Sequence, residues 1–141
     1  MSSRSKSRKR ALDALYASEI RGGEPLALLQ ETAGSVSERQ NQEAIFDYAE
    51  SMITGFDANK LLIDNELRQL ADGWALERMP SIDRAILRLG AWEILYNPDV
   101  PNEVAIAEAV ALASEYSTDD SPKFVNGVPV SYTHLRAHET R

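Results

Sequence analysis

The sequence has no cysteine and no long apolar run. Without cysteine the chain can form neither a disulfide nor a thiolate metal site, which fits a reducing compartment such as the cytoplasm. No segment approaches the roughly 18–20 consecutive apolar residues that cross a bilayer. The basic residues near the start are not followed by the apolar stretch of a secretory signal. We therefore expect a cytoplasmic protein that does not insert into a membrane.

Sequence features typical of catalysis or cofactor binding are also scarce. There is no glycine-rich phosphate loop, and no serine–histidine or cysteine–histidine arrangement precedes the last eleven residues. The only histidines, His134 and His138, have the i, i+4 spacing of a helical metal pair. They follow Pro129 in a polar stretch without a predicted core, and a stable metal site needs further ligands and a supporting shell. We expect no metal, no cofactor and no catalytic activity.

Positive charge is concentrated at the start of the chain. The first ten residues hold five of the fifteen cations. These are Arg4, Lys6, Arg8, Lys9 and Arg10, called the basic segment below. The rest of the chain carries ten cations against 22 acids, a balance of -12. Such segregation predicts a local site for a polyanion such as a nucleic acid. The alternative is a solvated tail, which the serines among residues 2–7 favour.

Hydrophobic residues recur at helical spacing along nearly the whole chain, and no segment alternates convincingly as a strand does. Prolines and capping residues mark several starts. The expected helices cover about 4–20, a segment from Pro25, one after the capping box of Ser37 and Gln40, one after Asp57, 81–96, one from Pro101 to about 117, and one from Ser121–Pro122. Short connections favour an antiparallel helical bundle.

The spacing of apolar residues also predicts which side of each helix is buried. The expected inward residues are Ile45, Tyr48, Ala49, Met52, Ile53 and Phe56 in the third helix, and Leu61, Leu62, Leu67 and Leu70 in the fourth. The sixth helix contains Val104, Ile106, Val110 and Ala113, and its many alanines suit tight contact with another helix. Segment 81–96 is apolar nearly all round, which is typical of a helix at the centre of a core. If the first helix extends back through the basic segment, Arg4 and Arg8 lie one turn apart on one face.

Four blocks of sequence, in order, resemble the NusB family of bacterial transcription antitermination factors. They are RALDALY (10–16), WALERMPSIDRAILRLGAWEILY (74–96), VPNEVAIAEAVALASEYS (100–117) and SPKFVNGV (121–128). The resemblance spans roughly residues 4–128 and implies an all-α fold of about seven helices, with two packed three-helix groups. It implies binding without catalysis. The implied partners are single-stranded boxA-type leader RNA of ribosomal RNA operons, the ribosomal protein NusE, and the RNA polymerase antitermination complex.

The resemblance also implies site residues. The basic segment matches the family's arginine-rich RNA-binding segment, and Tyr16 could stack on a splayed base. The remaining residues implied at the RNA are Asp120, Lys123 and Phe124, and those implied at NusE are Glu77, Arg78, Arg84 and Arg88. The acidic remainder of the chain would repel RNA elsewhere and attract a basic ribosomal protein. Replacing Arg8 and Arg10 by alanine is expected to weaken RNA binding while NusE binding is retained.

Agreement with the family stops after Val128. Residues 129–141 begin with a helix-breaking proline and have no inward stripe, so we expect a domain of residues 1–128 followed by a non-native or disordered tail. Two other functions stay open at this point. One is a helical adaptor for proteins with no RNA contact, and the other is the accessory domain of an RNA methyltransferase. Some proteins of this type self-associate, so a homodimer is a further alternative.

Overall fold

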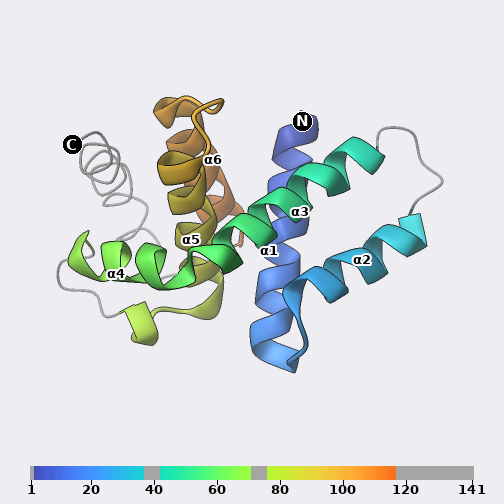
Figure 1. The fold of residues 1–141 in the computed structure, drawn as a ribbon, viewed down its shortest axis with the longest axis horizontal. Helices are drawn as coiled ribbons and strands as arrows, with labels where there is room; N and C mark the ends of the chain where they lie inside the picture. Colours follow the sequence, from blue (N-terminus) through green and yellow to red (C-terminus); the bar gives the residue numbers. More distant parts are fainter. Residues whose placement is uncertain (1, 37–41, 71–75, 117–141) are drawn as a thin grey trace. The chain divides into compact units, whose positions relative to one another are not determined.

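The computed structural model describes residues 2–36, 42–70 and 76–116, and all regular structure in these ranges is helical (Figure 1). The helices are α1 (Ser3–Arg21), α2 (Pro25–Val36), α3 (Gln42–Ala58), α4 (Lys60–Leu70), the short 3-10 helix η1 (Leu76–Arg78), α5 (Ser81–Tyr96) and α6 (Asn102–Tyr116). The expected all-α class is confirmed. The predicted capping box at Ser37 and Gln40 and the seventh helix from Ser121 lie outside the described residues.

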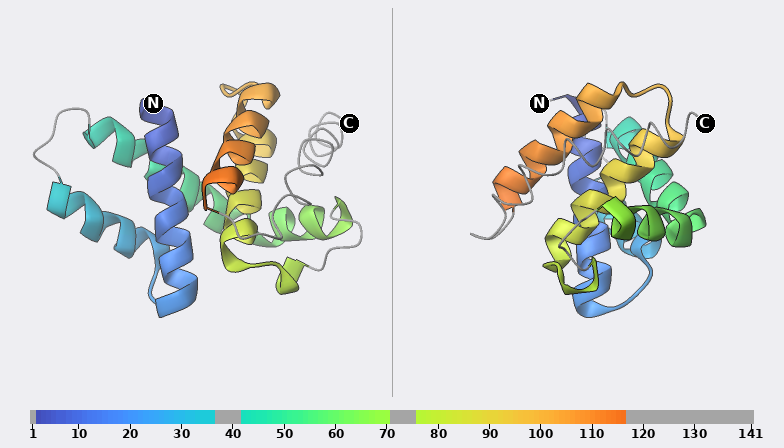
Figure 2. Two further views of the ribbon diagram at one scale, coloured as in Figure 1. Left: turned by 180° about the vertical axis from the view of Figure 1, so that it is seen from behind. Right: turned by 90° about the vertical axis from the view of Figure 1, so that its left-hand side faces the viewer.

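The chain divides into two compact units, Met1–Ala58 and Asn59–Arg141. In the first unit α1, α2 and α3 each contact the other two, and Figures 1 and 2 show α1 and α3 crossing. Helix α1 ends where predicted, because Gly22 and Gly23 have φ angles of 85° and 96°, a conformation that side chains with a Cβ rarely adopt. Pro25 then opens α2 at a position where its missing N–H is no loss.

The core of the first unit lies along the predicted inward side of α3. Ile45, Ala49, Met52, Ile53 and Phe56 are all buried there, against buried residues of α1 and α2. The prediction for α3 is therefore confirmed for these residues. Tyr48 is only half-buried, at the edge of the stripe.

In the second unit α5 contacts both α4 and α6. It runs over the predicted residues 81–96, between Pro80 and Asn97, and ten of its sixteen residues are buried. This confirms the expectation that the most apolar helix is central. Because α5 is enclosed on several sides, even its acidic residues Asp83 and Glu93 are buried.

Helix α4 is rotated from the predicted orientation. Leu61 and Leu62 are 77% and 61% exposed, so the expectation that they face inward was wrong. The helix starts at Lys60, whereas Asp57, its expected cap, belongs to α3. Ile63 and Leu67, four residues apart, are the apolar residues it buries, as expected for Leu67. The side chain of Leu70 lies outside those described.

Helix α6 packs mainly through its alanines. Val104 is 43% exposed, and Ile106 and Val110 are half-buried. The buried residues are Ala105, Ala109, Leu112 and Ala113. Small side chains let two helix backbones approach closely, so the alanine side of α6 faces α5 and the larger valine is turned outward. This packing agrees with the expectation that the many alanines of this helix suit tight helix contact.

Candidate nucleic-acid interface

The basic segment forms the first two turns of α1, and its serines hold it in place. Ser2 caps the helix, because its hydroxyl oxygen accepts a hydrogen bond from the Ser5 N–H at 3.1 Å. Ser7 is buried, and its hydroxyl oxygen lies 2.8 Å from the carbonyl oxygen of Ile45 on α3 and 3.0 Å from that of Ser3. The hydroxyl can therefore donate a hydrogen bond that joins α1 to α3. The basic segment is part of the docked helix, not a separate tail.

Two arginines of the segment lie over aromatic rings of α3. The Cζ atom of Arg4 is 3.8 Å from the centre of the Tyr48 ring, and that of Arg10 is 5.3 Å from the centre of the Phe46 ring. Both distances are within the range of cation–π attraction. Arg4 is exposed overall, so the Tyr48 ring supports a guanidinium that solvent still reaches. This contact joins positions 44 residues apart in the chain.

Arg8 differs from the other cations of the segment. Its residue is only 4% exposed, whereas Lys6 is exposed and Lys9 and Arg10 are half-buried. Helix α1 does extend back through the basic segment, so Arg4 and Arg8 lie one turn apart on one face as expected, but only Arg4 is exposed there. Arg4, Arg8 and Leu12 follow one another at four-residue spacing on one face of α1, and Leu12 is in the core. Arg8 is buried because it lies one turn closer to Leu12 than Arg4 does.

An acidic side chain, Asp13, accompanies the exposed cations. Burial raises the pKa of the Asp13 carboxyl, while the charges of Arg10 and Lys9 act in the opposite direction. Tyr16, one turn further along α1, is 40% exposed and its ring is open to solvent. Both positions lie on the same helix as the basic segment, so α1 alone carries the cations, the acidic Asp13 and the exposed Tyr16.

The second unit holds the residues expected at NusE, and three of them have contacts within the chain. Arg88 on α5 forms a two-point ion pair with Asp64 on α4, with Nε–Oδ1 and Nη2–Oδ2 distances of 2.9 and 3.0 Å. The pair is largely buried, with side-chain exposures of 18% and 6%. Glu77 pairs with Arg68 at 2.6 Å. Its own backbone N–H and the Arg68 guanidinium lower the pKa of the Glu77 carboxyl.

Arg84 holds the segment that precedes α5. Its Nη1 atom lies 3.0 Å from the carbonyl oxygen of Leu76 and 3.2 Å from those of Glu77 and Met79. Two effects lower the pKa of Arg84: burial, which is the larger, and the charge of Arg88. Arg78 is exposed. Sequence reasoning had no signal for these internal contacts, because their partners are distant in sequence or are backbone atoms.

Several expected positions fall outside the described part of the chain. Asp120, Lys123 and Phe124 are among them, as are His134 and His138. Within the described ranges, no three or more acidic, histidine or cysteine side chains gather as metal ligands would. Every helix in those ranges is too short or too polar to span a bilayer.

These features define an all-α protein whose first helix carries a docked cationic surface. The NusB family model matches residues 5–129. The chain is 50% identical over 131 residues to the transcription antitermination protein NusB of Clavibacter michiganensis subsp. michiganensis, covering 91% of this chain and 93% of that one. It is 47% identical over 128 residues to that of a Nocardioides species, covering 91% of each. The chain belongs to the NusB family.

Solved structures have the same fold. T. maritima NusB superimposes with a TM-score of 0.81 at 30% identity, covering 95% of this chain and 90% of that one. A complex described as antitermination factors NusB and NusE with double-stranded RNA contains a chain with a TM-score of 0.79 at 23% identity. That likeness covers 96% of this chain and 97% of the other, and concerns the fold.

Proposed function

We propose that this chain is a non-catalytic transcription antitermination factor that binds boxA-type leader RNA together with NusE, in the RNA polymerase complex of ribosomal RNA operons. Membership of the NusB family supports this proposal, because the relatives at 47–50% identity are named transcription antitermination proteins. A member of this fold has been solved with NusE and RNA. The RNA site is the solvent-facing part of the basic segment on α1.

The docking of α1 carries the RNA-binding part of the proposal. A cation on a mobile tail must be ordered when it binds, whereas Arg4 and Lys6 already stand on a capped helix joined to α3 through Ser7. Pre-ordered cations can follow a phosphate backbone, and the exposed ring of Tyr16 can stack on an unpaired base. Tyr48 is added to the predicted site as a residue that positions Arg4.

RNA binding is tested by removing the accessible cations and measuring the salt dependence of affinity. In a Lys6→Ala, Lys9→Ala, Arg10→Ala variant, affinity for boxA-type single-stranded RNA should fall at low salt. The slope of log K against log salt should become shallower by about 0.7 for each lost phosphate contact. The matched control is Lys60→Ala, an exposed cation at the start of α4. A slope equal to that of the unaltered chain would refute this location for the RNA site.

The form of the RNA is tested in the same assay. Stacking on Tyr16 requires an unpaired base, so a single strand should bind more tightly than the same sequence in a duplex, and Tyr16→Ala should reduce that difference. The related solved complex contains double-stranded RNA, so both forms are relevant. Equal affinity for the two forms would be consistent with phosphate contacts but would refute the stacking role of Tyr16. The first measurement should therefore use both forms.

The NusE contact is tested separately from RNA binding. Of the residues predicted there, the exposed Glu77 and Arg78 remain our candidates for direct contact. Arg84 and Arg88 are proposed to act by holding η1, α4 and α5 in position, because their guanidinium groups are occupied within the chain. Loss of NusE binding in a Glu77→Ala, Arg78→Ala variant, with RNA binding unchanged, would support two separate surfaces. Retention of NusE binding would place its contact elsewhere.

We also propose that residues 1–128 form the functional domain and that residues 129–141 add nothing to it. The end of the family match at residue 129 supports this division. A chain ending at Val128 should keep the same melting temperature and RNA affinity as the full chain. A lower melting temperature in the shorter chain would show that the last residues contribute to the fold.

A further inference from the structure

A pocket between α2 and α3 lies in the first unit, and none of the residues assigned to RNA lines it. Its volume is about 380 Å³. The apolar part of its lining comes from Leu29 and Ala33 on α2 and from Phe46 on α3. Leu29 and Phe46 are core residues, 2% and 8% exposed, and Arg10 lies over the Phe46 ring. The pocket therefore has a fixed apolar floor and enough volume for a large side chain.

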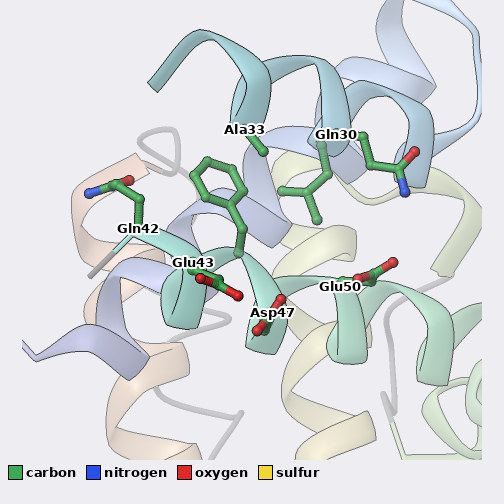
Figure 3. A pocket seen from close by; sticks show the side chains of 8 residues that line it. Gln30, Ala33, Gln42, Glu43, Asp47 and Glu50 are labelled. Carbon is green, nitrogen blue, oxygen red and sulfur yellow. The ribbon is translucent and has the colours of Figure 1, made fainter. Parts of the chain in front are cut away.

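One wall of the pocket is acidic. Glu43, Asp47 and Glu50 follow one another at i, i+4 and i+7 along α3, so their carboxylates lie in a row beside the apolar floor (Figure 3). All three residues are exposed. Helix α2 supplies the opposite wall with Gln30 and Ala33 and no charge of either sign. A row of like charges next to an apolar floor repels a phosphate backbone and attracts a cationic ligand.

A polar group at one end of the pocket favours a ligand that carries a hydrogen-bond donor. The side-chain oxygen of Gln42 is buried and has no hydrogen-bond partner among the described residues. Gln42 lies at the start of α3, one residue before Glu43 (Figure 3). A buried amide oxygen without a donor is costly, so a ligand that brings an N–H or ammonium group to this end gains from satisfying it.

We propose that this pocket, called the α2–α3 groove below, is a docking site for a cationic segment of a protein partner. The segment inserts one large apolar side chain between Leu29, Ala33 and Phe46, and its flanking lysines or arginines pair with the acidic row on α3. Three observations carry the proposal: the apolar floor, the single sign of the charged residues that line the pocket, and the unsatisfied acceptor at its end. The occupant thus has the opposite charge to the RNA proposed for α1.

The groove can be tested with designed peptides and the full chain. The probe is a fluorescently labelled peptide with a single leucine flanked by lysines, and fluorescence anisotropy reports binding. A second peptide carries serine in place of leucine, and a third carries glutamates in place of the lysines. The first should bind, and the other two should bind about tenfold more weakly or not at all.

Two variants locate the binding. Glu43→Gln, Asp47→Asn, Glu50→Gln neutralises the row and should weaken the leucine–lysine peptide about tenfold at low salt. Ala33→Leu fills the pocket and should weaken it by a similar factor at any salt concentration. The matched control is Glu24→Gln, Asp57→Asn, Asp99→Asn, which removes the same charge from exposed positions outside the groove and should change affinity less than twofold.

Several results would overturn the proposal. Equal binding of the serine peptide would show attraction by charge alone, and equal loss in the control variant would show that the charges act from anywhere on the surface. Self-association of the chain that Ala33→Leu abolishes would make a second copy the occupant. Melting temperature and RNA affinity serve as folding controls. If Ala33→Leu does not fold, the charge variant still tests the proposal. Groove variants that bind RNA normally would show that the groove and the RNA site are separate.

Discussion

Breaking the ion pair between Arg88 and Asp64 should strongly destabilise the second unit. The pair joins α5 to α4 by two short hydrogen bonds, and the Asp64 side chain is only 6% exposed. In Arg88→Met the carboxylate stays buried without its partner. Removing one member of a buried pair costs about 3–5 kcal/mol, much more than the value of an exposed pair, because the remaining charge is left desolvated. We expect a loss of unfolding free energy near the lower end of that range, since Arg88 is 18% exposed.

The assay is urea denaturation followed by tryptophan fluorescence, because Trp92 lies in α5 and is 9% exposed. The double variant Arg88→Met, Asp64→Leu removes both charges and should recover much of the lost stability. Arg78→Met, at an exposed position, should change stability by no more than about 0.5 kcal/mol. The reasoning is refuted if Arg88→Met costs less than about 1 kcal/mol, or if the double variant is no more stable than the single one.

Three further predictions concern α1 and α4. Because the pKa of Asp13 is raised, its charge is lost as pH falls through a range above that of an ordinary aspartate, so RNA affinity should rise there. Protonation of Asp13 should also stabilise the fold. This stabilisation is present at low pH and is lost as pH rises through the raised pKa. Asp13→Asn should bind RNA more tightly at neutral pH and lack this step, and an identical pH profile would contradict the assignment. Ser7→Ala should cost about 1 kcal/mol in urea denaturation and weaken RNA binding, since the link from α1 to α3 is lost; unchanged RNA affinity would mean that docking through Ser7 does not matter. Leu61→Lys and Leu62→Lys should each change stability by less than about 0.5 kcal/mol, whereas Ile63→Ala should cost about 2–5 kcal/mol; the reverse order would show that α4 has another orientation.

The burial of Arg8 changes how the RNA site should be probed. Replacing Arg8 and Arg10 together, as the sequence first suggests, would combine a surface change with the loss of a side chain that is 4% exposed. Weakened RNA binding in that variant could come from partial unfolding of α1. Lys6, Lys9 and Arg10 are better choices, because their residues are exposed or half-buried.

Local chemistry was enough to predict where most helices begin and end. Glycines at 22 and 23, Pro25, Pro80 and Asn97 act through the backbone of their immediate neighbours, and the helices follow them within a residue or so. Of the blocks of sequence that resemble the NusB family, RALDALY lies within α1, and residues 81–96 and 102–116 of two others form α5 and α6. The family and the all-α class could therefore be predicted without knowing any contact distant in sequence.

Orientation and pairing were beyond the sequence, because each depends on which helix lies opposite. A helix with a broad apolar arc can bury either edge of it, and the neighbouring helix selects the edge. Thus α4 buries Ile63 and exposes Leu61. The contact of Arg4 with Tyr48 and the ion pair of Asp64 with Arg88 likewise exist only once separate helices have packed. The positions of the charges along the chain come from the sequence, but packing determines which of them reach solvent.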